Sequence, residues 1–579
     1  MRNARSPLSW GSHPQTPLET TQPWRLLILG AVMTSFAVFI LQHLYWYQVT
    51  DQANLLQIAE DVHEERRSIA PQRGALLDTH GHPLAVTVSY QSLFVFRPQI
   101  RDVDKTTATL APLVGMAPAE IAAIIQEAER EWKRVKHRIP SAIANEIEAK
   151  HLPGVDLRPT RVRDYPEGSI AAQVLGFVGL DGRGLSGLEL TLDEELTGKQ
   201  GLLVTERDTE GREIYLARKQ LLPAQGGADV VLTIDRQLQR TAERILGQAI
   251  RENKGTGGVI IVMDPATGGI LALASQPTFS LGPELQIERG REAFYKPTPV
   301  TDTYEPGSVL KLMTVAAALE EQVVNANTPY FDSGVAVVEG TPIRNWDGRG
   351  YGTVSVRQIL QYSLNTGSQW VAGQLGADRF YRYLDAFGFG HATGVPLNGE
   401  AAGYYRTPSD SDWSRTDLAT NAYGQSITAT PLQVIMAVAS LANGGVRMKP
   451  QLVREVRGPS GVKKIEPQAA QRVVSPATAD TMLDMMNSVW EQPALQPNWI
   501  KGYSIAGKSG TADIAGPGGY NGKTYASFVG LGPMPNPRFA VLVRVDQPET
   551  TWGGLAAAPA LRFMFEDIFS YLKIPPSRA

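Results

Sequence analysis

The sequence predicts an α+β fold that follows a single N-terminal transmembrane helix. Three observations predict it: a charge-free apolar run near the N terminus, two apolar strands joined by a turn within 257–279, and helical segments at 309–321, 431–442 and 477–490. A sheet that opens with a hairpin and is followed by long helices is typical of α+β layering. At 579 residues the chain is too long for one typical core, so two or three domains are expected.

The apolar run spans Leu26–Tyr47 and contains no Asp, Glu, Lys or Arg. At about 1.5 Å per residue, a helix of this length reaches about 33 Å, enough to cross a hydrocarbon core of about 30 Å. Trp24 flanks one end and Tyr45-Trp46-Tyr47 the other, which is typical of aromatic residues at membrane interfaces. We therefore predict a transmembrane anchor at residues 26–48.

The charges on either side of the anchor predict its orientation. Basic residues precede it and acidic residues follow it, namely Arg2, Arg5 and Arg25 before, and Asp51, Glu60 and Asp61 after. The positive-inside rule then predicts a cytoplasmic tail at 1–25 and an extracytoplasmic location for the residues after about 48. A cleaved signal peptide is the alternative. It fits less well, because the run exceeds the usual ~7–15 apolar residues and no A-x-A site follows it.

Beyond the anchor the sequence divides into two regions of different character. Residues 49–225 are predicted to form a stalk and an extended mixed pedestal, with a polar helix at 51–67, a strand at 91–98 and a helix at 119–135. Residues 226–579 are predicted to form a second domain, which opens near Asp229 with a strand running into a helix. Its hairpin turn, Asp264–Gly269, has glycines suited to positive φ, and later strands are expected at 503–507, 525–532 and 538–546.

Composition excludes several classes of function. The chain has no cysteine, which rules out disulfides, thiolate metal sites and cysteine catalysis. Its net charge is -3 and no basic stripe is present, so no nucleic-acid partner is predicted. We predict no metal and no cofactor.

The first candidate catalytic motif is Ser308-Val309-Leu310-Lys311. Pro306-Gly307 interrupts the chain and a helix-forming run follows, so Ser308 is expected at a helix N terminus with Lys311 one turn later on the same face. A serine hydroxyl needs an adjacent base to act as a nucleophile, and a lysine can be that base if burial or another cation favours its neutral form. The same spacing at Ser460–Lys463 and Ser570–Lys573 is expected to be chance.

A second candidate motif is Ser363-Leu364-Asn365, after the predicted helix RQILQYSL. Ser363 offers a hydroxyl that can relay a proton, and Asn365 offers an amide that can bind a peptide carbonyl and contact a lysine. Taken alone, this tripeptide fits a loop cap after the helix better than a catalytic motif.

The third candidate motif is Lys508-Ser509-Gly510-Thr511, after the predicted strand GYSIAG, which would place it on a sheet edge. Lys508 brings a second cation, and the hydroxyls of Ser509 and Thr511 suit a carboxylate. Gly510 is expected to let a ligand approach the backbone closely. A polar turn is the alternative.

The three motifs, in this order, resemble the signature of penicillin-binding proteins and class A β-lactamases. Residues 73–85, RGALLDTHGHPLA, resemble the segment that opens the pedestal of class B penicillin-binding proteins, and 164–179 and 184–201 resemble two further pedestal segments. The chain is thus identified as a member of this class, leaning to the division type. The resemblance implies a dimerisation-type pedestal and a transpeptidase domain built as an antiparallel sheet with helices on both sides.

The resemblance also implies a role for each motif residue. Ser308 would be the acylated nucleophile and Lys311 its base, while Ser363 relays a proton and Asn365 orients substrate and Lys311. Lys508, Ser509, Gly510 and Thr511 would hold the terminal carboxylate, and the N–H groups of Ser308 and Thr511 would form the oxyanion hole. The expected reaction cross-links peptidoglycan stem peptides that end in D-Ala-D-Ala, releases D-alanine and is blocked covalently by β-lactams.

The expected partners are the membrane and a polytopic SEDS-family glycan polymerase, because no glycosyltransferase domain fits in the pedestal. A β-lactamase is one alternative, but Gly394 stands where the class A motif has Glu before the candidate Leu397-Asn398. A bifunctional synthase and a non-enzymatic sensor are the others. The intact motif residues argue against the sensor.

Overall fold

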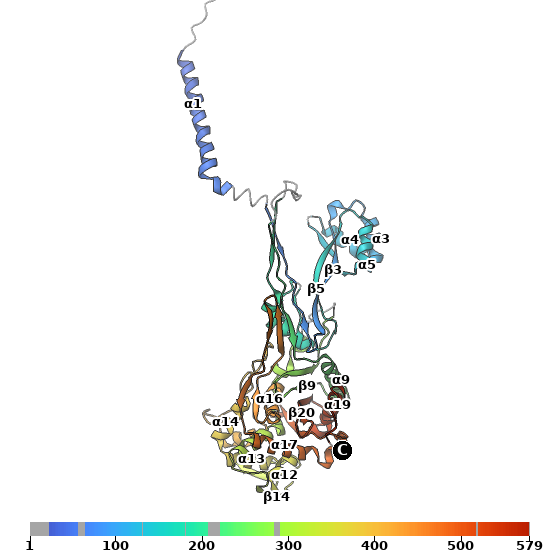
Figure 1. Cartoon of the computed structure of the whole chain (residues 1–579), viewed down its shortest axis with the longest axis vertical. Coiled ribbons are helices and arrows are strands. Elements are labelled where there is room, and N and C mark those ends of the chain that lie inside the picture. The colour runs from blue at the N-terminus through green and yellow to red at the C-terminus, as the bar shows by residue number, and fades with distance from the viewer. Residues whose placement is uncertain are drawn as a thin grey trace, which may run out of the picture. The chain divides into compact units, whose positions relative to one another are not determined.

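The computed structural model describes residues 23–55, 64–129, 131–179, 181–206, 220–282, 290–516 and 519–577 (Figure 1). The chain divides into two compact units. The first comprises Met1–Ala70 and Gln200–Pro223, and the second comprises Pro71–Lys199 and Ala224–Ala579.

The first unit contains the apolar helix α1 (Pro23–Tyr45), which continues into the π-helical turn η1 (Trp46–Thr50). By length and composition this helix can cross a membrane, and none of its side chains is buried. The unit also contains a three-stranded antiparallel sheet in the order β1-β6-β7, formed by β1 (Glu64–Ile69), β6 (Gly201–Glu206) and β7 (Gln220–Leu222).

The predicted helical stalk at 51–67 is wrong at its C-terminal end. Residues 52–55 are helical, 56–63 lie outside the described residues, and Glu64 already belongs to strand β1. Strand β1 pairs with β6, a segment more than a hundred residues later, from Glu64↔Glu206 to Ile69↔Gly201. Pairing with a distant strand satisfies the backbone of this segment and overrides its local preference for helix.

The pedestal part of the second unit is a small sheet covered by helices. Strand β3 is central and pairs antiparallel with both β4 and β5. Its elements are β2 (Leu76–Leu77), β3 (Pro83–Val95), α3 (Val103–Val114), α4 (Pro118–Glu127), β4 (Lys133–Ile139), α5 (Ser141–Ala149), β5 (Val155–Asp164), α6 (Ala172–Leu175), α7 (Gly187–Thr191) and α8 (Asp193–Thr197). The predicted strand at 91–98 lies largely in β3. The predicted helix at 119–135 ends at Glu127, because the segment from Lys133 pairs with β3 instead.

The larger part of the second unit is a five-stranded antiparallel sheet in the order β10-β9-β21-β20-β19. The strands are β9 (Gly257–Met263), β10 (Ile270–Gln276), β19 (Ala506–Gly516), β20 (Gly519–Gly532) and β21 (Phe539–Asp546). The hairpin predicted for β9 and β10 is confirmed. Of its two adjacent turn glycines, Gly268 has positive φ (74°) and Gly269 does not. The predicted strand at 503–507 begins only at Ala506 and runs through the third motif.

Helices cover both faces of this sheet, as predicted (Figure 1). In β9, Val259, Ile261 and Met263 join the core shared with α11 (Lys311–Glu320), α16 (Pro431–Ala442) and α17 (Pro476–Trp490). The alternate residues Ile260 and Val262 join the core shared with α9 (Arg236–Glu252) and α19 (Ala558–Tyr571). Because successive side chains of a strand point to opposite faces, this fully apolar strand is buried on both sides.

Shorter elements complete the second unit. They are β8 (Asp229–Leu232), α10 (Thr298–Thr301), β11 (Pro329–Asp332), β12 (Val335–Val338), β13 (Thr341–Arg344), β14 (Gly352–Ser355), α12 (Val356–Gln361), α13 (Asn365–Leu375), α14 (Ala377–Phe387), α15 (Arg415–Asn421), β15 (Val446–Met448), β16 (Val453–Gly458), β17 (Gly461–Lys464), β18 (Ala469–Arg472) and α18 (Gly553–Ala556).

The pedestal sheet continues into the rest of this unit, and it has seven strands in all. Strand β8 pairs parallel with β2 of the pedestal and antiparallel with β16, within the order β17-β16-β8-β2-β3-β4. Strand β8 begins at Asp229 and is followed by helix α9, so the strand and helix predicted to open this region are confirmed. The sheet runs from the pedestal into the region after residue 226, so hydrogen bonds connect the two sides of the predicted domain boundary.

Candidate active site

Ser308 lies in a tight turn that is packed against strand β19. Gly307–Val309 form the 3₁₀ turn η4, and the α-helix α11 starts three residues after Ser308, at Lys311. Gly307 has φ +55°, and a Cβ there would lie 2.5 Å from the carbonyl oxygen of Thr511. Only glycine therefore allows the turn that presents Ser308 beside the third motif.

Lys311 is fully buried (0 % exposed) and reaches the second motif. Its Nζ donates to the Ser363 carbonyl oxygen at 2.5 Å, the Ser363 Oγ at 3.2 Å and the Asn365 Oδ1 at 2.8 Å. Within the described residues, these bonds go to the second motif and none joins Lys311 to Ser308. Nucleophile–base contacts in ligand-free sites are often long and tighten when substrate binds.

Lys508 brings the third motif to the same point. It is 1 % exposed, and its Nζ donates to the Ser363 Oγ at 3.0 Å and to the Ser509 carbonyl oxygen at 3.0 Å. The Ser363 hydroxyl is therefore within hydrogen-bond distance of both lysine nitrogens. A hydroxyl between two amines can pass a proton from one side of a site to the other.

Burial changes the pKa of both lysines. Burial, and then the charge of Lys508, hold the pKa of Lys311 well below its usual range. Burial alone lowers the pKa of Lys508 to about 7. Neutral amine is thus available near neutral pH, which is the condition for a lysine to accept a proton from a serine hydroxyl.

Ser363 lies in the loop between α12 and α13, where the sequence predicts the end of a helix. It has φ +57°, a backbone conformation that non-glycine residues seldom adopt. The neighbouring Leu364 is fully buried in the core, which explains an apolar residue in the middle of this motif. The fixed Leu364 side chain and the bonds to the lysines hold Ser363 in this strained conformation.

The third motif lies inside the edge strand β19, as the prediction of a sheet edge requires. Thr511 is exposed, and its Oγ1 accepts from the Gly553 N–H at 3.3 Å, while Ser509 is half-buried. A Cβ on Gly510 would lie 2.4 Å from the Ser527 Oγ and 3.0 Å from the Val309 Cγ2. Close packing against strand β20 and the Ser308 turn thus requires a glycine at 510.

The two other Ser-x-x-Lys matches have a different environment. Ser460 and Lys463 are exposed at the β16–β17 turn, and Ser570 and Lys573 are exposed at the end of α19. Neither lysine is buried as Lys311 and Lys508 are.

Two neighbours of Asn365 escaped the sequence analysis. The Arg344 carbonyl oxygen accepts from the Asn365 Nδ2 at 2.9 Å, and the Asn345 Oδ1 accepts from the Asn365 backbone N–H at 3.1 Å. No motif marks these residues, because Arg344 acts through its backbone carbonyl and Asn345 becomes a neighbour of Asn365 only through folding.

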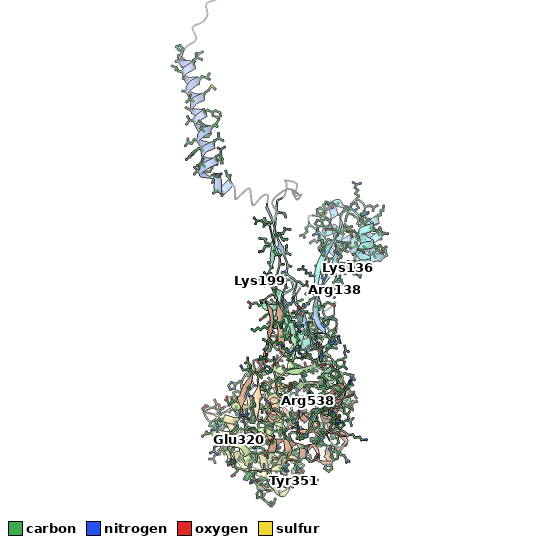
Figure 2. The ribbon with its side chains drawn as sticks, viewed as in Figure 1. Lys136, Arg138, Lys199, Glu320, Tyr351 and Arg538 are labelled. Carbon is green, nitrogen blue, oxygen red and sulfur yellow. The ribbon has the colours of Figure 1, made fainter. Side chains whose placement is uncertain are left out.

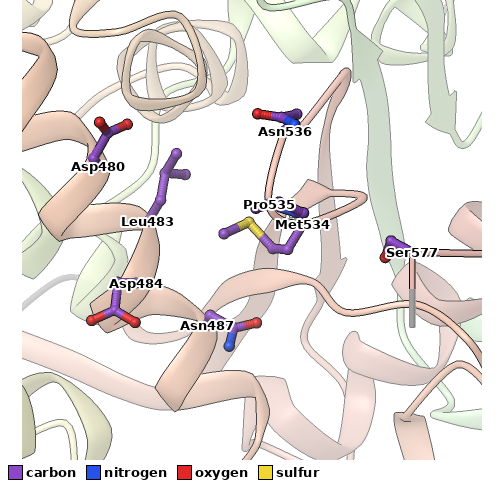
Figure 3. A pocket seen from close by; sticks show the side chains of 8 residues that line it. All are labelled: Asp480, Leu483, Asp484, Asn487, Met534, Pro535, Asn536 and Ser577. Atoms are coloured by element: carbon purple, nitrogen blue, oxygen red, sulfur yellow. The ribbon is translucent and has the colours of Figure 1, made fainter. Parts of the chain in front are cut away.

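A cleft of about 470 Å³ lies elsewhere, between α17 and the turn after β20 (Figure 3). It is lined by Asp480, Leu483, Asp484, Asn487, Met534, Pro535, Asn536 and Ser577. None of the three motifs contributes to it, and one of its two carboxylates, Asp484, is paired with Arg357 at 2.6 Å. The cleft is therefore not the candidate active site.

The comparisons with known proteins agree with this geometry. Residues 258–569 match the penicillin binding protein transpeptidase domain, and residues 68–232 match the penicillin-binding protein dimerisation domain. The chain belongs to the penicillin-binding protein transpeptidases. The presence of both domains confirms the predicted class B membership and the predicted fold.

The relatives include a protein named as a peptidoglycan D,D-transpeptidase. Stage V sporulation protein D of Bacillus subtilis is 31% identical over 569 residues, which cover 96% of this chain and 87% of the relative. The peptidoglycan D,D-transpeptidase FtsI of Escherichia coli is 29% identical over 574 residues, which cover 96% and 92%. Such relatives confirm that this penicillin-binding protein is a transpeptidase enzyme.

Solved structures show the same architecture. Penicillin binding protein 3 of Mycobacterium tuberculosis, solved in complex with aztreonam, has a TM-score of 0.68 and 25% identity, over 88% of this chain and 98% of that one. Penicillin binding protein 2X of Streptococcus thermophilus has a TM-score of 0.74 at 24% identity, over 87% and 80%. At this low identity, the similarity to penicillin binding protein 2X concerns the fold alone.

Proposed function

We propose that this penicillin-binding protein is a serine-type peptidoglycan D,D-transpeptidase with Ser308 as its nucleophile. The observation that carries the proposal is the meeting of two buried lysines, Lys311 and Lys508, at the Ser363 hydroxyl, beside the turn that holds Ser308. This arrangement supplies a base, a proton relay and a local positive charge for one acyl transfer.

In the proposed first step, the Ser308 Oγ attacks the carbonyl carbon between the two terminal D-alanines of a donor stem peptide. Neutral Lys311 takes the hydroxyl proton, and the backbone N–H groups of Ser308 and Thr511 stabilise the oxyanion. When the peptide bond breaks, a proton passes through the Ser363 hydroxyl to the departing D-alanine amine. An ester on Ser308 and free D-alanine result.

In the second step, an amine of a neighbouring stem peptide attacks the ester. Its surplus proton passes to Lys311 and on to the Ser308 oxygen as the ester bond breaks, so the enzyme returns to its starting state. The new peptide bond cross-links two strands. Asn365, whose amide already contacts Lys311, is proposed to orient both this lysine and the donor peptide.

The third motif is proposed to bind the carboxylate at the end of the donor. Lys508 supplies charge, and the hydroxyls of Ser509 and Thr511 supply hydrogen bonds along the exposed edge of β19. A β-lactam carries a carboxylate and a reactive amide in a similar arrangement. We infer that it acylates Ser308 and inhibits the enzyme.

The membrane topology and the partner complete the proposal. We infer a cytoplasmic tail at 1–25, an anchor at 26–48 and an extracytoplasmic catalytic domain, on the strength of the charge asymmetry and the apolar helix α1. The glycan strands would come from a polytopic SEDS-family polymerase that contacts the anchor and pedestal.

The test is labelling of the purified protein with a fluorescent penicillin, followed by mapping of the modified peptide. Ser308→Ala is expected to abolish the label, whereas Ser460→Ala and Ser570→Ala, which change the other two Ser-x-x-Lys matches, should keep it. Label that persists on the Ser308→Ala protein would refute the assignment.

A further inference from the structure

A buried polar network lies directly behind the second motif. Its members are Asp332 at the end of β11, Asn345 just after β13 and Thr366 in the first turn of α13. All three are nearly inaccessible to solvent, and Asp332 is 1 % exposed. Tyr351, labelled in Figure 2, borders the network near β14.

The Asp332 carboxylate is held by four neutral donors. Its Oδ1 accepts from the Thr366 hydroxyl at 2.7 Å and the Gly334 N–H at 3.1 Å. Its Oδ2 accepts from the Asn345 Nδ2 at 2.8 Å and the Tyr351 N–H at 3.0 Å. A buried carboxylate with four donors is a strong anchor, because removing any donor leaves part of the charge unsatisfied.

The carboxylate fixes which way the Asn345 amide points. Its Nδ2 donates to Asp332 and to the Arg349 carbonyl oxygen at 2.9 Å, so its Oδ1 must face α13. There the Oδ1 accepts from the Asn365 N–H at 3.1 Å and the Thr366 N–H at 3.4 Å. Leu364, at the N-cap position of α13, provides no side-chain cap, so Asn345 caps the helix from a loop about twenty residues earlier.

The capped helix start is the second motif itself. Asn365 is the first residue of α13, and its side chain is held between Lys311 at 2.8 Å and the Arg344 carbonyl oxygen at 2.9 Å. Ser363, two residues earlier, has a strained backbone whose carbonyl and hydroxyl both contact Lys311. A shift of the start of α13 would therefore move the acceptors that surround the lysine.

We propose that Asp332 and Asn345 are positioning residues of the transpeptidase site: the buried carboxylate orients the Asn345 amide, and this amide holds the start of α13 so that Ser363 and Asn365 meet Lys311. The inference rests on the proposed roles of Ser308, Lys311 and the second motif. It adds a set of residues, outside the three motifs, on which the rate of acylation depends.

Two isosteric or truncating changes test it. Asn345→Ala removes the cap, and Thr366→Val removes one donor to Asp332 while preserving side-chain shape. Thr366→Ser is the conservative partner, because it keeps the hydroxyl. Asn327→Ala, at an exposed turn before β11, is the matched control for the asparagine.

The measurement resolves acylation by a fluorescent penicillin into a dissociation constant and a first-order acylation rate, each per folded molecule. We expect Asn345→Ala and Thr366→Val to lower the first-order rate by about tenfold to a hundredfold, as misplacement of catalytic groups does. The dissociation constant should change less than the acylation rate, because the carboxylate-binding strand β19 is untouched. Thr366→Ser and Asn327→Ala should behave like the unaltered protein.

A lower melting temperature with an unchanged acylation rate per folded molecule would overturn the proposal, since a merely structural role predicts that result. If Asn345→Ala does not fold, the comparison of Thr366→Val with Thr366→Ser decides: equal rates refute the proposal. Mapping the labelled residue distinguishes failure of the proposed function from failure of the positioning role. Label away from Ser308 refutes the proposed function, whereas label on Ser308 at an unchanged rate in the variants refutes only the positioning role.

Discussion

The chemistry depends on one hydroxyl between two buried amines. Ser363 Oγ is 3.2 Å from the Lys311 Nζ and 3.0 Å from the Lys508 Nζ, and both lysines are almost entirely buried. Two cations in one buried site repel each other, so one of them is favoured in its neutral form. We therefore assign the role of base to Lys311 and the role of charge carrier to Lys508, and substitutions of each lysine test this assignment.

Lys311→Arg is expected to be nearly as damaging as Lys311→Ala. Arginine keeps the charge but is not deprotonated in proteins, so it cannot accept the Ser308 proton. Lys311→Met, which fills a similar volume without a base, is the control for packing. The assay is the rate of penicillin acylation per folded molecule. If the arginine variant were acylated at a rate within about tenfold of the unaltered protein, a barrier change of roughly 1.4 kcal/mol, the base role would be disproved.

Acylation by a carboxylate-bearing penicillin should show a bell-shaped pH profile. The rate rises as Lys311, whose pKa is depressed by burial and Lys508, becomes neutral, and it falls as Lys508, with a pKa lowered to about 7, loses its charge. Because the two lysines interact, the two apparent pKa values of the profile describe the pair and not either lysine alone. Lys508→Arg keeps its charge at every pH, so its alkaline fall should disappear.

The control for that profile is Lys523→Arg, at an exposed position of β20. It should leave both limbs in place. An alkaline limb that persists in the Lys508→Arg enzyme would mean that another group titrates there.

Thr511→Val should slow acylation by β-lactams that carry a carboxylate. The anion would lose a charge-assisted hydrogen bond worth roughly 1.5–3 kcal/mol. The same β-lactam with an esterified carboxylate should acylate poorly and respond less to the substitution. The Thr511 Oγ1 also accepts from the Gly553 N–H, so equal slowing of both compounds would show that it acts on local backbone geometry instead.

Two elements place these residues. The edge strand β19 carries the third motif, and Gly307 and Gly510 let it approach the Ser308 turn closely. Helix α13 carries the second motif at its first residue, capped from outside by Asn345. A third element, α1, is fully exposed along its length, which leaves its surface open to lipid or to another helix.

The small residues of α1 predict a helix partner. Gly30 and Thr34 lie four apart, as do Ala31 and Ser35, and such ridges let another helix pack closely. Replacing Gly30 and Thr34 with leucine should leave penicillin labelling normal while co-purification of the proposed SEDS-family polymerase falls. Val32→Leu with Phe36→Leu, at the same spacing, is the matched control. If co-purification is undiminished in the Gly30/Thr34 variant, the helix acts only as a membrane anchor.

Within the second unit, the pedestal and the catalytic region are joined by one continuous sheet. Strand β8 lies between β2 and β16, so its backbone bonds connect the two regions. A buried ionic cluster lies near this junction: Glu189, fully buried, accepts from Arg73 and Arg163, each at 2.7 Å. The contact with Arg73 joins segments more than a hundred residues apart.

Glu189→Gln should destabilise the protein strongly. It leaves the buried Arg163 guanidinium without its counter-charge, a loss typically of about 3–5 kcal/mol, while Arg73 keeps its pair with Asp193 at 2.6 Å. Thermal melting, followed together with penicillin labelling, should show a lower melting temperature and unchanged labelling of the folded fraction. Glu549→Gln, which breaks an exposed pair with Lys254, is the control and should change little. A melting temperature that matches this control would contradict the role of the cluster.

Local features of the sequence were sufficient for several parts of the molecule. The apolar run predicted α1, the β9–β10 hairpin followed from its turn, and the three motifs followed from residue type and spacing. Such signals are contained within a few residues, because hydropathy, helix propensity and turn chemistry act over that range.

Only the tertiary structure decided the rest. Strands β1 and β4 formed where helix was predicted, since each pairs with a strand that is remote in sequence. Spacing placed Lys311 near Ser308, but folding turned its amine to Ser363 and brought Lys508 there from almost 150 residues away. The Asn345 cap is likewise invisible in the sequence. Contacts between distant residues depend on how whole elements pack, and no local pattern contains that information.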